Sequence, residues 1–144
     1  MLGAFRRAAV AIAAGPLLIA SGAAGDEPIN IPADTETVAG GVPVACTGIG
    51  QTKLDPRWTA YPVRVEFSDS HDKYLTDVEI TVWDARGRSV LSVKCAGPWI
   101  LLRPAPGAYR IEGRLLDVTA APRTAPFKPP AKGQIRLVLK FPDV

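Results

Sequence analysis

Histidine is nearly absent from this chain, because His71 is the only one among 144 residues. A zinc site with two or three histidine ligands is therefore excluded. His71 stands beside Asp69 and Asp72, but neighbours in one turn do not supply the mutual geometry of a Ser-His-Asp triad. The chain also lacks a phosphate-binding loop and a dinucleotide-binding fingerprint. We interpret His71 as part of a polar hairpin tip and expect no catalytic group, metal or cofactor.

Helical patterning is missing from the chain after its N-terminal residues. No window there keeps apolar residues at three- and four-residue spacing over three turns. The N-terminus combines Arg6 and Arg7 with an apolar stretch over residues 8–20, and Gly22 and Ala24 close it. This combination is typical of a secretory signal peptide, and the stretch is short for a membrane span. We assign residues 1–24 to a signal peptide, with an uncleaved anchor helix as the alternative. The mature protein is then periplasmic or secreted, without a stable membrane anchor.

Charge of one sign is missing from a long segment near each end of the chain. No Lys or Arg occurs between Ala8 and Thr52, and no Asp or Glu occurs between Val118 and Pro142. The whole chain carries 17 basic and 14 acidic residues, and two of the basic ones leave with the signal peptide. Such a balance, without a basic run, argues against nucleic-acid binding. We interpret the two ends as solvated; attraction between them, or contact of the basic end with an acidic polymer, is the alternative.

Cysteine is as scarce, with Cys46 and Cys95 as the only two. Cys95 shares the face of an alternating run with Leu91 and Val93, which disfavours an exposed nucleophilic thiol. An exported chain meets oxidising conditions, under which two cysteines tend to pair. We predict a Cys46–Cys95 disulfide, and two free thiols are the alternative.

The chain is rich in strand patterning from residue 61 onward. Apolar and polar side chains alternate over residues 61–69, 77–84, 89–95, 109–115 and 134–141, and residues 99–103 form a short apolar run. Alternation is typical of strands with one wet face, and the apolar run fits a central strand. We predict an all-β fold for residues 42–144: an antiparallel two-sheet sandwich of six to seven strands. A flexible arm over residues 25–41 separates it from the N-terminal signal helix.

Two aromatic residues belong to this predicted architecture. Tyr109 follows the Gly107 turn, so we expect its ring to face inward and its hydroxyl to bond back to the turn backbone. Trp99 starts the short apolar run and is expected to pack inside the sandwich. An aromatic platform for a sugar or a peptide is the alternative role for Trp99.

Residues at the turns and strand starts match a known pattern. They are Asp77, Val78, Ile80, Val82, Asp84, Gly87, Val90, Gly97, Pro98, Trp99, Pro106, Gly107, Tyr109 and Ile111. Over residues 42–141 the chain resembles bacterial carboxypeptidase regulatory-like domain proteins, a prealbumin-like (transthyretin-like) group of β-sandwiches. The Gly-rich "CTGIGQ" is similar to the start of such domains, but "QTKLDP" stands where acidic residues commonly follow. The resemblance implies an exported, non-catalytic accessory module without a cofactor.

The segment 118–133 departs from the strand pattern, since four prolines surround Phe127. We interpret it as an extended, partly polyproline-II loop that either docks a partner or simply joins two strands. In the docking interpretation Phe127 is the anchor, and the cations around it are Arg123, Lys128 and Lys132. The favoured function is therefore a cell-envelope accessory protein that binds a protein partner. The alternative is a module that binds a glycan, a peptide or a cell-wall polymer on Trp58 or Trp83.

Export gives the first testable expectation. Protein isolated from a periplasmic fraction should lack residues 1–24, because Gly22 and Ala24 offer small side chains at the two positions that a signal peptidase reads. Intact-mass measurement checks this directly. A mature protein that retains Met1 would contradict it.

Overall fold

The computed structural model describes residue 15 and residues 27–144. The predicted signal peptide, apart from Gly15, lies outside the described residues. None of the helices in the described part of the chain is long and apolar enough to cross a bilayer.

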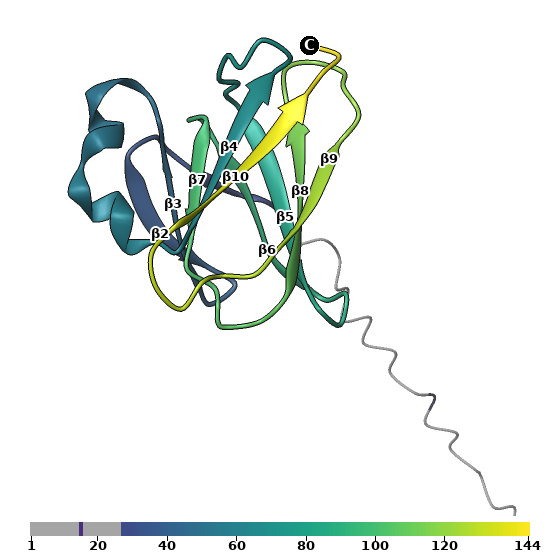
Figure 1. Cartoon of the computed structure of the whole chain (residues 1–144). Coiled ribbons are helices and arrows are strands. Elements are labelled where there is room, and N and C mark those ends of the chain that lie inside the picture. The colour runs from purple at the N-terminus through teal and green to yellow at the C-terminus, as the bar shows by residue number, and fades with distance from the viewer. Residues whose placement is uncertain (1–14, 16–26) are drawn as a thin grey trace, which may run out of the picture.

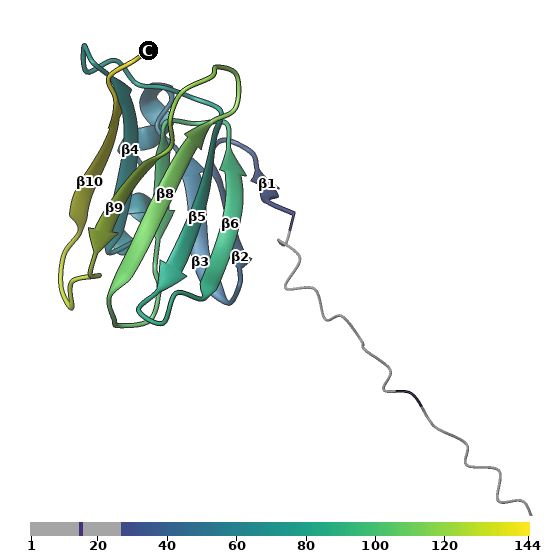
Figure 2. The ribbon, with the colours of Figure 1, turned by 90° about the vertical axis from the view of Figure 1, so that its right-hand side faces the viewer.

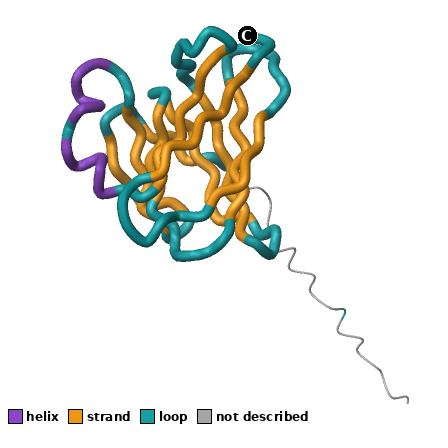
Figure 3. Tube along the Cα trace, viewed as in Figure 1, coloured by secondary structure: helices purple, strands orange, loops and turns teal. Residues whose placement is uncertain are grey.

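Ten strands form two five-stranded sheets that face each other as a sandwich (Figures 1 and 2). The β5 sheet consists, in spatial order, of β1 (Ile29–Ile31), β6 (Ser89–Cys95), β5 (Val78–Asp84), β8 (Tyr109–Leu115) and β9 (Arg123–Phe127). The β4 sheet consists, in spatial order, of β10 (Ile135–Phe141), β4 (Val63–Asp69), β7 (Trp99–Leu102), β3 (Val42–Thr47) and β2 (Thr35–Ala39). Two short 3₁₀ helices, η1 (Gly50–Leu54) and η2 (Pro56–Ala60), connect β3 to β4 and lie beside the sandwich (Figure 3).

One hydrophobic core fills the space between the sheets. It contains the inward residues of β4, β5 and β7, among them Phe67, Ile80 and Ile100, all fully buried. Alternation placed Phe67 and Ile80 on apolar faces, and Ile100 belongs to the predicted apolar run, so the predicted all-β sandwich is confirmed. Each of the six predicted strand segments corresponds to one strand, and β7 is buried along its whole length between β3 and β4.

The prediction of purely antiparallel sheets is wrong, because both sheets are mixed. β1 pairs with β6 in parallel, and β10 pairs with β4 in parallel over seven residues of each strand. The strand number is also higher than the predicted six to seven. Alternation identifies which face of a strand is buried, but it is the same for parallel and antiparallel neighbours. The relative direction of neighbouring strands is therefore visible only in the structure.

The segment 25–41, predicted as a flexible arm, contributes two strands instead. β1 pairs with β6 and buries Ile31, while β2 pairs with β3. Gly40 and Gly41 link β2 to β3 as a two-residue hairpin loop, and both have positive φ, 56° and 76°. That is the backbone of a type I′ hairpin turn, for which Gly-Gly is a preferred sequence. The glycine pair is thus a turn signal and not the end of a linker.

The predicted disulfide is confirmed. Cys46 on β3 and Cys95 on β6 are bonded, with Cα atoms 5.7 Å apart, so the bond joins the two sheets through the core. The segments that follow the two cysteines pass close to each other, because a Cβ on Gly97 would lie 2.3 Å from the carbonyl oxygen of Thr47. Only glycine fits there.

The interpretation of residues 118–133 as an extended loop with an exposed anchor is wrong for its middle part. Residues 123–127 form edge strand β9, which pairs with β8, and Phe127 is only 6% exposed. Its ring stacks on Tyr109 with centroids 5.4 Å apart. The Tyr109 hydroxyl donates to the Ala105 carbonyl at 2.7 Å, as expected from the sequence. Pro126 is tolerated because prolines can occupy edge strands, whose outer N–H groups have no ladder partner.

Phe127 should consequently behave as a core residue. Phe127→Ala is expected to lower the free energy of unfolding by about 3 kcal/mol, because it removes a buried aromatic side chain and its contact with Tyr109. Urea denaturation measures the change. Lys128→Ala, at the exposed next position, is the matched control and should leave stability within about 0.5 kcal/mol. Equal stability of the two variants would contradict the burial of Phe127.

Candidate functional site

The outer face of the β4 sheet is unusual because much of it is buried. In a two-sheet sandwich the outward residues of each strand normally meet solvent. Here Ala45, Thr47, Glu66, Trp99 and Leu101 all point outward, opposite to their core-facing neighbours, and all are at most 8% exposed. The segment η1–η2 covers one half of this face, and the β4–β5 loop reaches over the other half.

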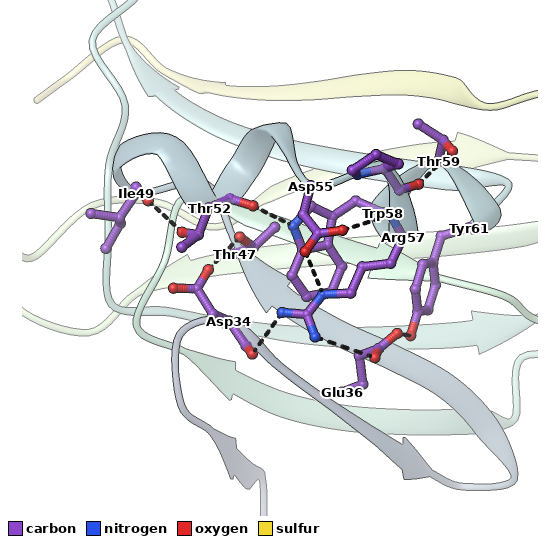
Figure 4. Close-up of polar contacts among 11 residues, drawn as sticks. Asp34, Glu36, Thr47, Ile49, Thr52, Asp55, Arg57, Trp58, Thr59 and Tyr61 are labelled. Carbon is purple, nitrogen blue, oxygen red and sulfur yellow. Dashed lines mark hydrogen bonds and ion pairs between the residues drawn. The ribbon is translucent and has the colours of Figure 1, made fainter.

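The covered half is a small second core, and Figure 4 shows two of its members, Trp58 and Tyr61. Trp58 and Tyr61 from the η2 region pack on Ala45 and Leu101. Trp58 is 3% exposed, and its indole N–H donates to the Thr52 carbonyl at 2.7 Å. The predicted role of Trp58 as an exposed ligand contact is therefore wrong. The indole serves to fasten the η1–η2 segment to the sheet.

A polar rim holds the same segment at its border with β2 (Figure 4). The Tyr61 hydroxyl donates to Glu36 at 2.7 Å, and Thr47 donates to Asp34 at 2.7 Å. Arg57 lies 3.9 Å from the Glu36 carboxylate. Burial, followed by the hydrogen bond and charge of Glu36, raises the pKa of Tyr61 to about 12. Every group of this rim is engaged within the fold, so we assign it a structural role.

The other residues singled out from the sequence are dispersed. Trp83 is half-buried on the outer face of the β5 sheet, where the Arg110 guanidinium lies 4.6 Å from the centre of its ring. His71 is exposed in a turn whose backbone N–H groups bond to Asp69, consistent with a polar hairpin tip. Arg123, Lys128 and Lys132 are exposed, but Phe127 does not join them at the surface. None of these residues lies beside Trp58 in a shared site, and the described residues contain no cluster of His, Cys, Asp or Glu able to hold a metal.

The open half of the outer face contains a buried carboxylate that sequence analysis did not single out. Glu66 on β4 is 1% exposed, between Val138 of β10 and Trp99 of β7 in the strand register. Arg136 donates to both oxygens of this carboxylate, at 3.2 Å for Nη2 to Oε1. The Tyr74 hydroxyl donates to Oε1 at 2.9 Å, and Arg64 Nε lies 3.1 Å from Oε2.

These partners set the ionisation of Glu66. Burial by itself raises the pKa of this carboxyl group. The hydrogen bonds from Arg136 and Tyr74 and the charges of Arg64 and Arg136 outweigh burial and hold the pKa below its ordinary value. Glu66 is therefore a fixed negative charge at neutral pH, and its hydrogen bond raises the pKa of Arg136 in return.

Trp99 is buried on this outer face and does not pack between the sheets as expected. Its neighbours are Tyr74, whose ring meets it edge-on at 6.2 Å, and Arg64, whose guanidinium lies 4.4 Å from the ring centre. Lys53 Nζ lies 6.0 Å from the Trp99 ring and 5.8 Å from that of Tyr74. Cations and an aromatic edge thus bury the indole, which is an arrangement typical of cation–π contacts.

Three buried polar side-chain atoms around Glu66 have no hydrogen-bond partner among the described residues. They are Arg64 Nε, Ser68 Oγ and Trp99 Nε1. All three belong to outward residues of β4 and β7, and the Ser68 and Trp99 side chains are more than nine-tenths buried. Arg64 Nε is near Glu66 but is not aligned for a hydrogen bond. Buried polar groups in proteins are nearly always hydrogen-bonded, so their concentration at one place is informative.

A hollow of about 540 Å³ opens on the same face, and of the three residues with a partnerless atom only Ser68 lines it. Its lining, which we call the Glu66 hollow, consists of Glu66, Ser68, Asp72, Tyr74, Arg136, Val138 and Lys140. Lys140 Nζ lies 2.7 Å from the Asp72 carboxylate at its rim. The hollow thus combines fixed charges, a partnerless hydroxyl and an aromatic edge. It is the candidate functional site.

The Glu66 ion pairs generate a prediction for acid stability. Glu66→Gln should lower the free energy of unfolding by about 2 kcal/mol at neutral pH, since the arginines lose their buried counter-charge. A carboxyl group with a lowered folded pKa stabilises the fold above its unfolded pKa, and this stability is lost as the pH falls through the folded pKa. Native protein should therefore lose stability below about pH 4.5, whereas the variant lacks this contribution throughout.

Urea denaturation from neutral pH to about pH 3 tests this by the difference between the two proteins. Asp69 and Asp84 also have lowered pKa values, chiefly through hydrogen bonds from turn N–H groups, but they titrate alike in both proteins. The stability difference should shrink as the pH falls. A difference that stays constant with pH would contradict the role of Glu66.

Comparison with known proteins gives no relative for this site. No family model matches the chain. A search of curated proteins also finds no match. The functions open to the chain therefore have to be derived from the Glu66 hollow itself.

Proposed function

We propose that the protein is a non-catalytic accessory module of the cell envelope that binds a protein partner at the Glu66 hollow. The observation that carries this proposal is an open hollow whose lining combines the fixed charges of Glu66 and Arg136 with Ser68, a buried residue whose hydroxyl has no hydrogen-bond partner among the described residues. A buried polar group that is left without a hydrogen-bond partner costs about 1–3 kcal/mol of stability. A bound group that supplies the missing partner would recover this free energy in the complex.

The chemistry of Glu66 supports binding over catalysis. A general acid or base works best with a pKa near the working pH and with a free position for the proton. The pKa of Glu66 is instead lowered, and Arg136 and Tyr74 occupy its oxygens. Such a carboxylate orients its neighbours, and here it fixes the Arg136 side chain in the lining of the hollow.

Two further features support an exported accessory module. The N-terminal residues have the composition of a signal peptide, and a disulfide is typical of oxidising compartments. The two-sheet sandwich is compatible with a prealbumin-like domain of the carboxypeptidase regulatory-like kind, and we propose that classification on the strength of the residues named above. The accessory role in the envelope follows from that resemblance.

A module for a glycan, peptide or cell-wall polymer is the second candidate. The observation in its favour is the Tyr74 ring, which lines the hollow and is 43% exposed. An exposed aromatic ring of this kind can pack against a sugar or a peptide side chain. Trp58 and Phe127 no longer support either function, since both are buried.

The test is site-specific photo-crosslinking in living cells. A photoreactive phenylalanine analogue replaces Val138, which lines the hollow and is 37% exposed, or Val38, which is 62% exposed on the opposite edge strand of the same sheet. A discrete crosslinked protein is expected from position 138 and not from position 38. The product should disappear when Arg136→Ala is added, and it should persist with Lys132→Ala, an exposed control.

Alternative outcomes are equally defined. Equal crosslinking from both positions would contradict the assignment of the hollow. No protein product, together with retention on a peptidoglycan column that Tyr74→Ala abolishes, would favour the second candidate.

A further inference from the structure

The loops at one end of the sandwich carry charge of a single sign. The β5–β6, β7–β8 and β9–β10 connections lie at this end, the lower one in Figures 1 and 2, together with the short link from η2 into β4. These connections contain no Asp or Glu. They contain five exposed cations: Arg86, Arg88, Arg103, Lys128 and Lys132.

Most of these cations have no counter-ion. Asp84, the last residue of β5, lies 3.1 Å from the Arg88 guanidinium and also accepts hydrogen bonds from N–H groups of its own turn. The other four cations make no ion pair within residues 27–144: Arg86, Arg103, Lys128 and Lys132. This end of the sandwich therefore keeps a surplus of positive charge, which attracts anions.

Two hollows open between these loops. The larger one, which we call the proline hollow, measures about 480 Å³, a size typical of sites for small ligands. The smaller one measures about 320 Å³ and lies between the β5–β6 turn and the β7–β8 loop. Pro106 belongs to both linings, so the two hollows adjoin. A ligand longer than one hollow can therefore continue into the other.

Cations outnumber carboxylates in the two linings. Arg103 lines the proline hollow, and Arg86 and Arg88 line the smaller hollow. Asp84 is the only carboxylate in either lining, and Arg88 already pairs with it. Both lysines of this end are sequence neighbours of residues that line the proline hollow. The surplus charge thus lies in the hollows and at their rims.

Arg103 is held in position at the proline hollow. Its Nη2 donates to the carbonyl of Ala60, another lining residue, at 2.5 Å, and its guanidinium lies 5.5 Å from the centre of the Tyr61 ring. A guanidinium has five N–H donors, and this is the one hydrogen bond of the Arg103 side chain within the described residues. The remaining donors are open to acceptor oxygens of a ligand.

The prolines add a second chemical feature to the larger hollow. A proline has a carbonyl group but no N–H, so its backbone accepts hydrogen bonds and cannot donate them. Hydroxyl groups of a ligand can donate to such carbonyls, and the C–H face of a sugar ring can pack on a proline ring. Five prolines line this hollow: Pro62, Pro104, Pro106, Pro129 and Pro130.

A membrane surface fits this end of the sandwich less well than a soluble ligand. Among the described residues, none of the exposed large hydrophobic side chains belongs to these loops. Binding in the plane of a bilayer needs such side chains for insertion. Single-stranded nucleic acid is also disfavoured, because its bases stack on exposed aromatic rings and these loops offer none.

We infer that this end of the sandwich is a second binding surface and that it binds an anionic glycan. One acidic sugar places its ring on the prolines of the proline hollow and its acidic group on Arg103. Neighbouring acidic sugars continue past Pro106 towards Arg86, and the two lysines add charge at the rim. This surface goes beyond the proposed partner site, because neither hollow shares a lining residue with the Glu66 hollow.

Isothermal titration calorimetry with sugar oligomers tests the inference on protein isolated from a periplasmic fraction. The probe is the hexamer of galacturonic acid, and the matched control is maltohexaose, a neutral hexamer. We expect the acidic hexamer to bind with an affinity that falls as the salt concentration rises, and the neutral hexamer to give no heat of binding. The inference fails if the acidic hexamer does not bind.

Three variants at exposed positions locate the site. Lys128→Ala should raise the dissociation constant of the acidic hexamer about fivefold, because an exposed ion pair with the ligand is lost. Arg123→Ala removes an exposed cation at the opposite end of β9 and should leave the dissociation constant unchanged. Ala131→Leu keeps the charge but fills part of the proline hollow, so it should weaken binding at least as strongly as Lys128→Ala.

The contrary outcomes are distinct. Equal effects of Lys128→Ala and Arg123→Ala would overturn the assignment to this end of the molecule. Linear polyphosphate or poly-glutamate that binds as tightly as the acidic hexamer, with no effect of Ala131→Leu, would overturn the glycan chemistry. Binding to phosphatidylglycerol vesicles without binding of the hexamer would assign the surface to a membrane instead. Crosslinking from position 138 reports on the Glu66 hollow alone, so either proposal can fail while the other stands.

Discussion

The disulfide between Cys46 and Cys95 is the constraint on which the arrangement of the outer face depends. It ties β3 of one sheet to β6 of the other across a loop of 49 residues, and on the loop-entropy model it contributes about 4 kcal/mol. The chain leaves the core immediately after Cys46 to build η1 and η2, and it starts β7 a few residues after Cys95. The bond therefore holds together the starting points of the η1–η2 cover and of the strand that presents Trp99.

The outer face of the β4 sheet shows how a small sandwich can bury polar groups without losing its fold. Its inward side already supplies the core, so the outward side is free to carry Glu66 and its arginines. Ion pairs of this kind contribute little net stability, because desolvation offsets much of the attraction. What they provide is fixed geometry: the carboxylate orients Arg64 and Arg136, and Tyr74 closes over them. Fixed donors beside a hollow are what a binding site requires.

The features that the sequence predicted correctly are local. Two-residue alternation identified five strands, because burial of one face acts on each strand separately, and a short apolar run identified a sixth. The scarcity of cysteine left one pairing to predict. Phe127 was assigned to an exposed loop because the same sequence pattern, an aromatic residue among prolines, occurs both in loops and on edge strands. Glu66 alternates like any residue of a wet face, and its burial depends on the Tyr74 loop and on the parallel neighbour β10. Those are long-range contacts, and no local pattern encodes them.

Pro126 on edge strand β9 has a consequence for how the molecule meets its neighbours. A proline has no N–H to offer a further strand, and β1, at the opposite edge of the β5 sheet, spans only three residues. Both edge strands of that sheet are therefore poor templates for pairing with a strand of another copy. Growth into fibrils through the β5 sheet is hindered from either side. At high protein concentration, the proline on one edge and the short strand on the other protect the β5 sheet without a partner that covers it.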